Sequence, residues 1–501
     1  MKKTVFGLLA ILAALYFSPV LASVSADEHK TAHKTEHVEA KDAHGAESHG
    51  DGHHGAPHFD GKNSSLFWAI PFLAILLSIA LFPLLAPHFW HHNYGKISLV
   101  IGLTFFVPFT IIQTPNMSFF YLLEVYLLEF LPFIVLLLAL YTVAGGIRLK
   151  GELIGSPKLN LLLILIGTSL ASWMGTTGAA MLMIRPLLKA NGWRKHKTHV
   201  VVFFIFLVAN IGGSLTPLGD PPLFLGFLKG VDFTWTLSAM LAPMLVAVAI
   251  LSVVFFILDT YYYKKEPGQP EKSTNGEKLG LEGTANLLLL PLIPISFLVA
   301  SMKLGTAFTV HHVAMPTASL LQVCILLLIT VASLVITKKE VRTANEFTWE
   351  PILEVAKLFA TIFITMVPPI AMLKAGADGP LGFIIRSLTD ANGGFINANF
   401  FWSTGILSSF LDNAPTYLVF FNTAGGNAAQ LMGPMYNTLL AISVGAVFMG
   451  ANTYIGNAPN FMVKSIAEEA GVPMPSFFGY FLKYAVTILI PTFIIITLIF
   501  F

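Results

Sequence analysis

The chain has little charge and almost no cysteine. Of its 501 residues only 11% are Asp, Glu, Lys or Arg, and Cys324 is the single cysteine. One cysteine excludes a disulfide framework and a cysteine-rich metal cluster. The formal net charge of +2 gives no indication of a nucleic-acid partner, and we expect none. No pattern in the sequence suggests covalent chemistry, so we do not expect an enzyme.

The sequence consists largely of long apolar runs. Hydrophobic residues make up 55% of the chain, and apolar stretches of 18 or more residues recur along most of its length. Each such stretch is long enough to cross a bilayer as a helix. Short alternating segments of about ten residues, which would indicate a membrane β-barrel, are not seen. We therefore predict an all-α polytopic membrane protein in contact with lipid.

The first 26 residues have the pattern of a signal peptide. Lys2 and Lys3 precede an apolar run, and V-S-A before Asp27 resembles a cleavage site. An uncleaved signal anchor is the alternative. Either interpretation predicts a bacterial inner-membrane protein with a periplasmic N-terminus.

Residues 27–64 differ from the rest of the chain, because they are polar and contain eight of its fifteen histidines. Such a segment cannot bury a core, so we predict a disordered periplasmic linker. Its imidazoles, for example those of His53 and His54, are weak candidates for binding zinc, copper or nickel. A solvated linker without a specific role is the favoured interpretation.

The basic residues predict the topology of the first half. The loops 146–158, 189–197 and 261–283 are rich in Lys and Arg, which places them in the cytoplasm. Because the apolar stretch 159–188 has basic loops on both sides, we predict a re-entrant hairpin with its tip near 173–178. Each arm is then about 20 Å long, too short to cross a core of about 30 Å.

The second half shows the opposite pattern. No Lys or Arg occurs from 387 to 463, so the loop 425–434 and a second hairpin, 397–424 with its tip at 410–416, are predicted on the periplasmic side. We expect a first repeat at 65–260, a cytoplasmic linker at 261–283 and a second repeat at 284–501. The expected membrane segments are 65–86, 96–113, 119–145, 159–188, 199–230, 234–260, 285–303, 317–337, 352–376, 397–424, 435–470 and 477–501.

The two halves share a short motif. GSLTPLGDPPLF at 213–224 aligns without gaps on GANTYIGNAPNF at 450–461, with five identical positions and an offset of 237 residues. Glycine and proline break the apolar spans 199–230 and 435–470 at these motifs. Because the two hairpins are predicted on opposite faces, the repeats are inverted, which is the architecture of secondary transporters.

Broken helices leave backbone groups free to bind an ion or a substrate, and Asp220 and Asp412 add carboxylates at the breaks. Capping of helix starts is the alternative role. Asp412 is expected to be the more essential, because the repeat partner of Asp220 is Asn457. We predict Na⁺ or H⁺ as the coupling ion, with neutral oxygens from Thr176, Asn210, Thr216, Asn413, Thr416, Asn452, Thr453 and Asn457.

NIGGSLTPLGDPP (210–222) and SSFLDNAPT (408–416) resemble motifs of the ion transporter superfamily. This group includes arsenite permeases, NhaD-type sodium/proton antiporters and citrate or dicarboxylate carriers. The resemblance implies a scaffold domain, a mobile transport domain holding both hairpins, elevator motion and a homodimer. NhaD-type antiporters carry Asp-Asn in both hairpin tips, whereas this chain has Gly175-Thr176 in the first. One candidate cation ligand is therefore missing.

The leading functional prediction is a sodium (cation)/proton antiporter. A citrate- or dicarboxylate-type organic anion carrier is the first alternative, in which helix ends hold the substrate carboxylates and a bound cation offsets their charge. Efflux of arsenite or another oxyanion is the third. A channel or a metal-sensing receptor belongs to a different class, and the inverted broken repeats argue against both.

Overall fold

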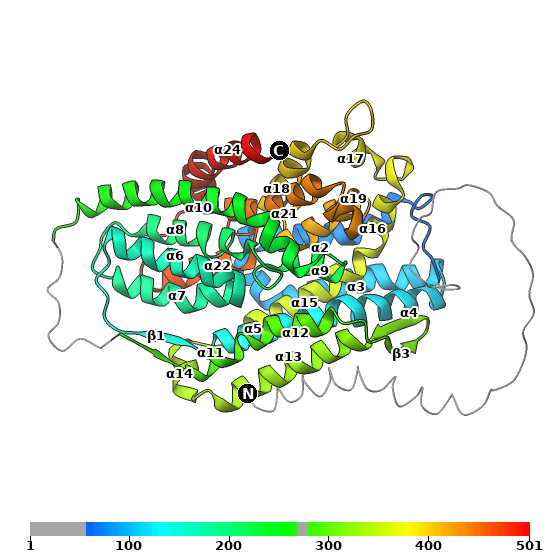
Figure 1. The fold of residues 1–501 in the computed structure, drawn as a ribbon. Helices are drawn as coiled ribbons and strands as arrows, with labels where there is room; N and C mark the ends of the chain where they lie inside the picture. Colours follow the sequence, from blue (N-terminus) through cyan, green and yellow to red (C-terminus); the bar gives the residue numbers. More distant parts are fainter. Residues whose placement is uncertain (1–56, 269–278) are drawn as a thin grey trace, which may run out of the picture.

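The computed structural model describes residues 57–268 and 279–501 (Figure 1). The predicted signal peptide and the candidate metal ligands His53 and His54 lie outside the described residues. Disorder was predicted for 27–64 and is wrong for residues 57–64, where Phe59 is buried against Phe109 and its backbone N–H donates to the Tyr121 hydroxyl at 3.0 Å. The buried Phe59 side chain therefore helps to dock this end of the described chain on the membrane helices.

The first half is almost entirely helical, as its composition predicts. In chain order its elements are η1 (Leu66–Ala69), α2 (Ile70–Leu85), α3 (Pro87–Ile112), α4 (Pro115–Glu124), η2 (Val125–Phe130), α5 (Leu131–Ala144), β1 (Arg148–Lys150), α6 (Pro157–Met174), α7 (Thr176–Ala190), α8 (Thr198–Leu207), η3 (Ile211–Ser214), α9 (Pro221–Leu228) and α10 (Phe233–Tyr263).

The second half has a similar sequence of helices, with a few additional short elements. These are β2 (Gly280–Glu282), α11 (Ala285–Leu289), α12 (Leu292–Ala300), β3 (Thr306–Val310), β4 (Val313–Pro316), α13 (Thr317–Ile336), α14 (Lys339–Ala344), α15 (Glu350–Thr365), α16 (Val367–Lys374), η4 (Gly376–Asp378), α17 (Gly382–Ser387), α18 (Asn397–Phe410), α19 (Asn413–Thr423), α20 (Ala428–Met432), α21 (Tyr436–Met449), η5 (Gly450–Asn452), α22 (Ala458–Glu469), α23 (Phe477–Tyr480), η6 (Phe481–Leu489) and α24 (Ile490–Phe500).

Within the described residues, seven helices are long and apolar enough to cross a membrane, or eight if the bent pair α15 and α16 counts as one span. This confirms a polytopic α-helical membrane protein. Two expected segments differ in detail. Helix α3 begins at Pro87 rather than near 96, because three histidines in its first turns lower the local hydropathy. The segment 285–303 is two short helices, α11 and α12, which separate next to Pro291.

Two small antiparallel strand pairs were not predicted. In one pair β1 aligns with β2, so that Arg148 lies opposite Glu282, and in the other β3 aligns with β4. The β1–β2 pair connects the loop after α5 to the chain segment that joins the two halves. Part of the predicted linker 261–283 is therefore held on the first half by backbone hydrogen bonds.

Two helical hairpins occur where the sequence predicts them. Helices α6 and α7 pack together and join at Gly175, and α18 packs on α19 next to Asp412. Helix α6 has 18 residues and is about 27 Å long, longer than the expected arm of about 20 Å, and it is one of the seven helices long and apolar enough to cross a membrane. Entry and exit of each hairpin by one membrane face stays a prediction.

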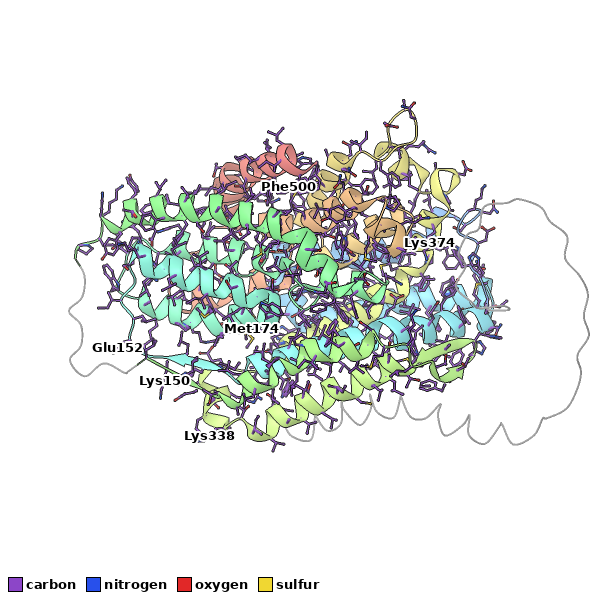
Figure 2. The ribbon with its side chains drawn as sticks, in the orientation of Figure 1. Lys150, Glu152, Met174, Lys338, Lys374 and Phe500 are labelled. Carbon is purple, nitrogen blue, oxygen red and sulfur yellow. The ribbon has the colours of Figure 1, made fainter. Side chains whose placement is uncertain are left out.

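The basic loops gather at one end of the molecule. Figure 2 places Lys150, Glu152 and Lys338 at this end and Lys374 at the opposite end, with Met174, the last residue of α6, between them. The common position of these loops agrees with the positive-inside argument. It does not assign the end to a compartment, so the cytoplasmic side stays a prediction.

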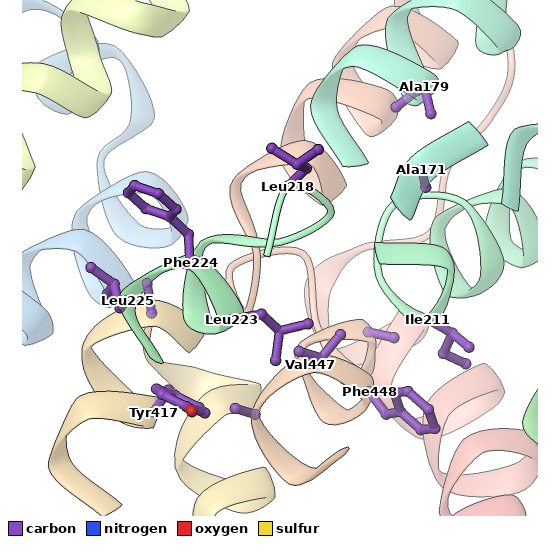
Figure 3. Packing of buried hydrophobic residues seen from close by; sticks show 14 of the residues in the cluster. Ala171, Ala179, Ile211, Leu218, Leu223, Phe224, Leu225, Tyr417, Val447 and Phe448 are labelled. Atoms are coloured by element: carbon purple, nitrogen blue, oxygen red, sulfur yellow. The ribbon is translucent and has the colours of Figure 1, made fainter. Parts of the chain in front are cut away.

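The two broken segments lie in the centre of the core. Figure 3 shows Ile211 of the first break close to Phe448, and Leu223, just after this break, close to Val447; Val447 and Phe448 lie near the end of α21. All four side chains are at most 2% exposed. Irregular backbone at membrane depth is tolerated only where protein or a cavity surrounds it, and here protein surrounds both breaks.

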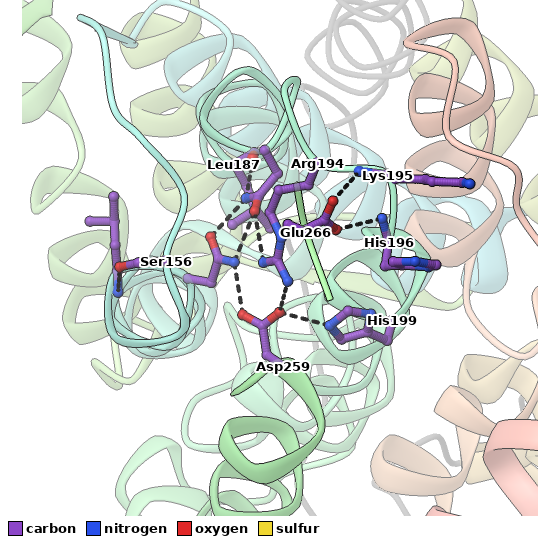
Figure 4. A network of polar contacts seen from close by, with 11 residues as sticks. Ser156, Leu187, Arg194, Lys195, His196, His199, Asp259 and Glu266 are labelled. Atoms are coloured by element: carbon purple, nitrogen blue, oxygen red, sulfur yellow. Dashed lines mark hydrogen bonds and ion pairs between the residues drawn. The ribbon is translucent and has the colours of Figure 1, made fainter. Parts of the chain in front are cut away.

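A buried polar network fixes α6 and α8 to α10 near the basic end (Figure 4). The Asp259 carboxylate accepts from Arg194 Nη2 at 2.5 Å and lies 2.8 Å from His199 Nε2. Its other oxygen accepts from Asn160 Nδ2 at 2.9 Å. The Asp259 and Arg194 side chains are both fully buried, so each compensates the charge of the other.

Candidate functional site

In the first break, the Asp220 carboxylate does not cap the helix that follows it. Asp220 occupies the position before α9, where an Asp side chain normally caps the helix by accepting a backbone N–H from one of the first residues. The next two residues are Pro221 and Pro222, which have no backbone N–H to donate. Asp220 makes no side-chain capping bond, so both carboxylate oxygens are available to other groups.

Three side chains from distant parts of the chain donate to this carboxylate. Asn413 Nδ2 lies 2.5 Å from Asp220 Oδ2, while Asn457 Nδ2 and Thr176 Oγ1 lie 2.9 Å and 3.2 Å from Oδ1. Asp220 itself is 1% exposed. Thr176 begins α7, Asn413 begins α19 and Asn457 precedes α22. Four predicted site residues therefore meet at one point, which joins both hairpin tips to both breaks.

The donors around Asp220 are all neutral. Two amides and one hydroxyl can orient an ionised carboxylate, but they cannot compensate its charge. Asp412 directly precedes Asn413, whose amide contacts Asp220, so a second carboxylate lies in the neighbourhood and makes an uncompensated negative charge on Asp220 less favourable. A small cation or a proton at Asp220 would relieve both costs.

Asp412 has a different local role. Its side chain accepts from the backbone N–H of Ala414 at 3.0 Å and caps α19. The hydroxyl of Thr416 donates to the Asp412 backbone carbonyl at 2.9 Å, within the first turn of the same helix. Capping, the alternative role of both aspartates, therefore describes Asp412 and not Asp220.

The predicted ligands Thr216 and Thr453 hold the breaks in shape. The Thr216 hydroxyl donates to the Ser172 carbonyl, and the Thr453 hydroxyl donates to the Ser409 carbonyl. Each hydroxyl also accepts the backbone N–H two residues later, at 3.2 Å in both halves. Every partner is displaced by the same 237 residues, so the two breaks are built alike. Neither hydroxyl bonds Asp220.

Three buried amide oxygens have no hydrogen-bond donor among the described residues. They are Oδ1 of Asn210, Asn413 and Asn452. The amide nitrogens of Asn210 and Asn452 are occupied, since they donate to Asn460 Oδ1 at 2.7 Å and to Ser409 Oγ at 2.9 Å. An unpaired buried acceptor is costly unless something binds it. Neutral oxygens of this kind are ligands for hard cations.

Sequence reasoning missed Asn460. Its Nδ2 donates to the carbonyls of Gly450 and Thr453 at 2.8 and 2.9 Å, and its Oδ1 accepts from Asn210. It thereby connects the first break to the second. The sequence could have indicated it. Asn460 follows Asn457 by three residues and is an amide next to a break in an apolar span, which is why the other asparagines were selected.

Helix α9, which follows Asp220, is followed in turn by a residue that forms an ion pair. Lys229 follows α9, and its Nζ lies 2.5 Å from Glu129 Oε1. Glu129 belongs to η2, a π-helical segment within the long span from Pro115 to Ala144. Single π-helical turns inside membrane helices are common at functional sites. Helix α9 thus links the Asp220 site to a charged contact with a neighbouring span.

Comparison with known proteins gives a consistent assignment. Residues 61–501 match the family described as "Putative citrate transport". An uncharacterized transporter of Mycobacterium tuberculosis is 28% identical over 346 residues, which cover 66% of this chain and 74% of the relative. An uncharacterized transporter of Synechocystis is 24% identical over 363 residues, 67% of this chain and 75% of the relative. A 46 kDa membrane protein of Mycobacterium leprae is 25% identical over 347 residues, 67% and 75% of the two chains.

The predicted resemblance to the ion transporter superfamily is confirmed at the level of this family, since that superfamily includes citrate carriers. The match begins close to the first described residues and runs to the last residue of the chain. It therefore includes both hairpins, both breaks and all four residues of the Asp220 cluster. The chain belongs to the citrate-transport family of multi-pass membrane transporters.

Proposed function

We propose that the chain is a secondary transporter that exchanges a small cation, most readily Na⁺, for a proton at Asp220. One observation carries the proposal: a buried carboxylate is held by Thr176, Asn413 and Asn457, which are neutral donors from both repeats. A buried carboxylate needs a proton or a cation to be stable. Either one can serve, which is the requirement for exchange.

The unpaired amide oxygens support a metal cation as one of the two exchanged species. Asn413 contributes its nitrogen to Asp220, while its Oδ1 has no donor in the described residues. Asn210 Oδ1 and the Asn413 amide both lie next to Gly450 in the second break. Carboxylate and amide oxygens are ligands that a hard cation prefers, whereas a proton needs only the carboxylate.

Coupling follows from competition for one site. When Na⁺ leaves Asp220, a proton takes its place, because an uncompensated charge at this depth is unfavourable. Asp220 is neutralised either by bound Na⁺ or by a proton. Only in these two forms would the hairpins move so that the site opens to the opposite side of the membrane. Each Na⁺ carried in one direction is thus exchanged for one proton carried in the other.

The test is flux through the purified full-length chain in proteoliposomes that contain a pH-sensitive dye. Na⁺, Li⁺ and K⁺ gradients are applied in turn, with an ionophore to hold the membrane potential at zero. A Na⁺ or Li⁺ gradient should move protons in the opposite direction, and empty liposomes give the background. Dye signals at background for every cation would contradict the proposal.

A second candidate function is cation-coupled transport of a small organic anion such as citrate. The family description of residues 61–501 favours it. In this case the cation at Asp220 would offset the carboxylates of the substrate, which the helix starts at α7 and α19 could hold. Uptake of labelled citrate that requires a cation gradient, in liposomes without cation/proton exchange, would favour this function over the first.

A further inference from the structure

A basic cavity lies between the first hairpin and the β1–β2 pair, apart from the Asp220 cluster. Its volume is about 170 Å³, and four cationic side chains and no acidic ones line it. The lining also includes Leu149, Met181 and Leu182, which give it an apolar wall. Its cationic residues are Arg148, Lys150, Arg185 and Lys189.

Two elements, β1 and α7, position the four cationic side chains around the cavity. Arg148 and Lys150 are two apart on β1, so their side chains lie on one face of the strand. Arg185 and Lys189 are four apart on α7, so they share one face of that helix. The strand and the helix stand on opposite sides of the cavity, which brings like charges together at a cost that an anion would remove.

Two carboxylates compensate part of this charge from outside the lining. Glu282 on β2 lies 3.2 Å from Arg148 and 2.9 Å from Lys150. Glu346 lies 2.5 Å from Arg185, but its side chain is 65% exposed, and exposed ion pairs contribute little and yield to competing anions. Neither carboxylate lines the cavity, so the wall that a ligand would meet is cationic.

We propose that this basic cavity binds a phosphate group, carried either by an anionic phospholipid of the bilayer or by a free phosphate ion. Guanidinium groups match phosphate oxygens in pairs, and ammonium groups add charge without strict geometry. A water molecule occupies about 30 Å³ in the liquid, so the cavity has room for a group with four oxygens. Basic pockets at the cytoplasmic ends of membrane helices commonly hold lipid headgroups.

The position in the molecule suits this ligand. Figure 2 shows Lys150 at the same end as Lys338, where the basic loops gather. This is the end that the positive-inside argument assigns to the cytoplasm, where anionic lipids and phosphate are both abundant. A ligand between α7 and β1 would bridge the first hairpin and the neighbouring loops, and would thereby restrict movement of the hairpin.

The test measures thermal unfolding of the purified chain in detergent while one probe is titrated. The probes are phosphatidylglycerol, phosphatidylcholine as its zwitterionic control, and inorganic phosphate with chloride as its control at equal ionic strength. Phosphatidylglycerol or inorganic phosphate should raise the unfolding temperature more than its control does. Stabilisation by the lipid alone identifies a headgroup site, and stabilisation by both identifies a phosphate site open to water. Equal effects of each probe and its control would overturn the proposal.

Two variants locate the effect. The double variant R185Q/K189Q should need roughly 25 times more ligand for half the effect, since each basic residue near anionic lipid contributes about a factor of five. The control K338Q/K339Q removes the same charge from exposed positions at the same end and should keep the wild-type value. Unchanged binding in R185Q/K189Q would contradict the site.

A third variant separates weak binding from poor folding. Glu346→Gln removes the partner of Arg185 without touching the lining, so it should tighten binding, by at most about fivefold, the factor expected for one full charge. A variant that is merely destabilised would not bind more tightly. Weaker binding in Glu346→Gln than in the wild type would argue against the cavity as the site.

Discussion

Asn413, the first residue of α19, donates a 2.5 Å hydrogen bond to Asp220, which precedes α9, although 193 residues separate them. The contact joins the tip of the second hairpin to the break of the first repeat. Thr176 makes the matching contact from the first hairpin at 3.2 Å. The site is therefore shared by both repeats. Because each hairpin donates a hydrogen bond to Asp220, binding of a cation or a proton there changes a contact of both hairpins.

Asp220→Asn should reduce coupled proton flux to the level of empty liposomes, because the amide binds neither a proton nor a cation in the same way. Asp412→Asn should keep much of the flux, since Asn caps a helix about as well as Asp. The dye assay in proteoliposomes measures both, and gel filtration checks that each variant folds. Equal loss in the two variants would show that Asp412 has more than a capping role.

Thr216→Val and Thr453→Val should destabilise the protein to a similar extent, because each removes one donor and one acceptor at equivalent places in the two breaks. We expect about 1 to 3 kcal/mol for each. Thermal unfolding measures the loss. The control is Thr330→Val, whose hydroxyl bonds only the Leu326 carbonyl of its own helix at 2.8 Å. A much larger loss in one break than in the other would contradict equivalent roles.

Labelling decides the orientation of the two halves. In a Cys324→Ala background, cysteines are placed at the exposed positions Lys195 and Gln430, which lie in the loops 189–197 and 425–434. A reagent that cannot cross the membrane should label the first from the cytoplasm and the second from the periplasm. Labelling of both from one side would refute the inverted topology.

Asp259→Asn should destabilise the protein strongly, because the buried Arg194 guanidinium would lose the carboxylate that lies 2.5 Å away and keep only Glu266, at 3.9 Å. Removing one partner of a buried pair costs about 3 to 5 kcal/mol. The matched control is Glu468→Gln, which removes the partner of Lys464 in a partly exposed pair four residues apart. It should cost about 0.5 kcal/mol or less. Similar unfolding temperatures for the two variants would show that the Asp259 network contributes little.

The β1–β2 pair should loosen only in acid. The hydrogen bond from Lys150, together with Arg148, lowers the pKa of Glu282 below its ordinary value of 4.5. Its contribution to stability is thus fully present above pH 4.5 and is lost as the pH falls through the lowered pKa. Pepsin cleavage near 279–283 should increase at that point in the wild type. Glu282→Gln should be cleaved without this pH step, and a step above pH 5 would contradict the assignment.

Much of the fold follows from the sequence because membrane helices are recognised by their length and hydropathy. The breaks could also be predicted, since glycine and proline gathered within an apolar span interrupt its helix. The two strand pairs could not, because β1 and β2 are three residues long and lie more than 120 residues apart. Pairing over such a distance leaves no local signal.

The candidate site was predicted as a set of residue types, but not as a set of contacts. Asp412 was expected to matter more than Asp220, from the comparison of repeat partners alone. The relative importance of the two aspartates stays a prediction, but the sequence analysis did not use Pro221 and Pro222, which remove the N–H donors that would have occupied the Asp220 side chain. The tip at Asp412 is followed by Asn413 and Ala414, which keep their N–H groups, so this aspartate caps.

The contact between Asp220 and Asn457 has a consequence for biogenesis. The two residues are 237 positions apart, and Asn413 precedes Asn457 by only 44 of them. At about 5 to 20 residues per second, the ribosome needs roughly 10 to 50 s to reach Asn457 after it has made Asp220. During this interval the first half already sits in or near the membrane with a carboxylate that lacks its amide partners. Until the second half is made, Asp220 must therefore be protonated or hydrated. The site is complete only when Asn413 and Asn457 have been synthesised and donate to this carboxylate.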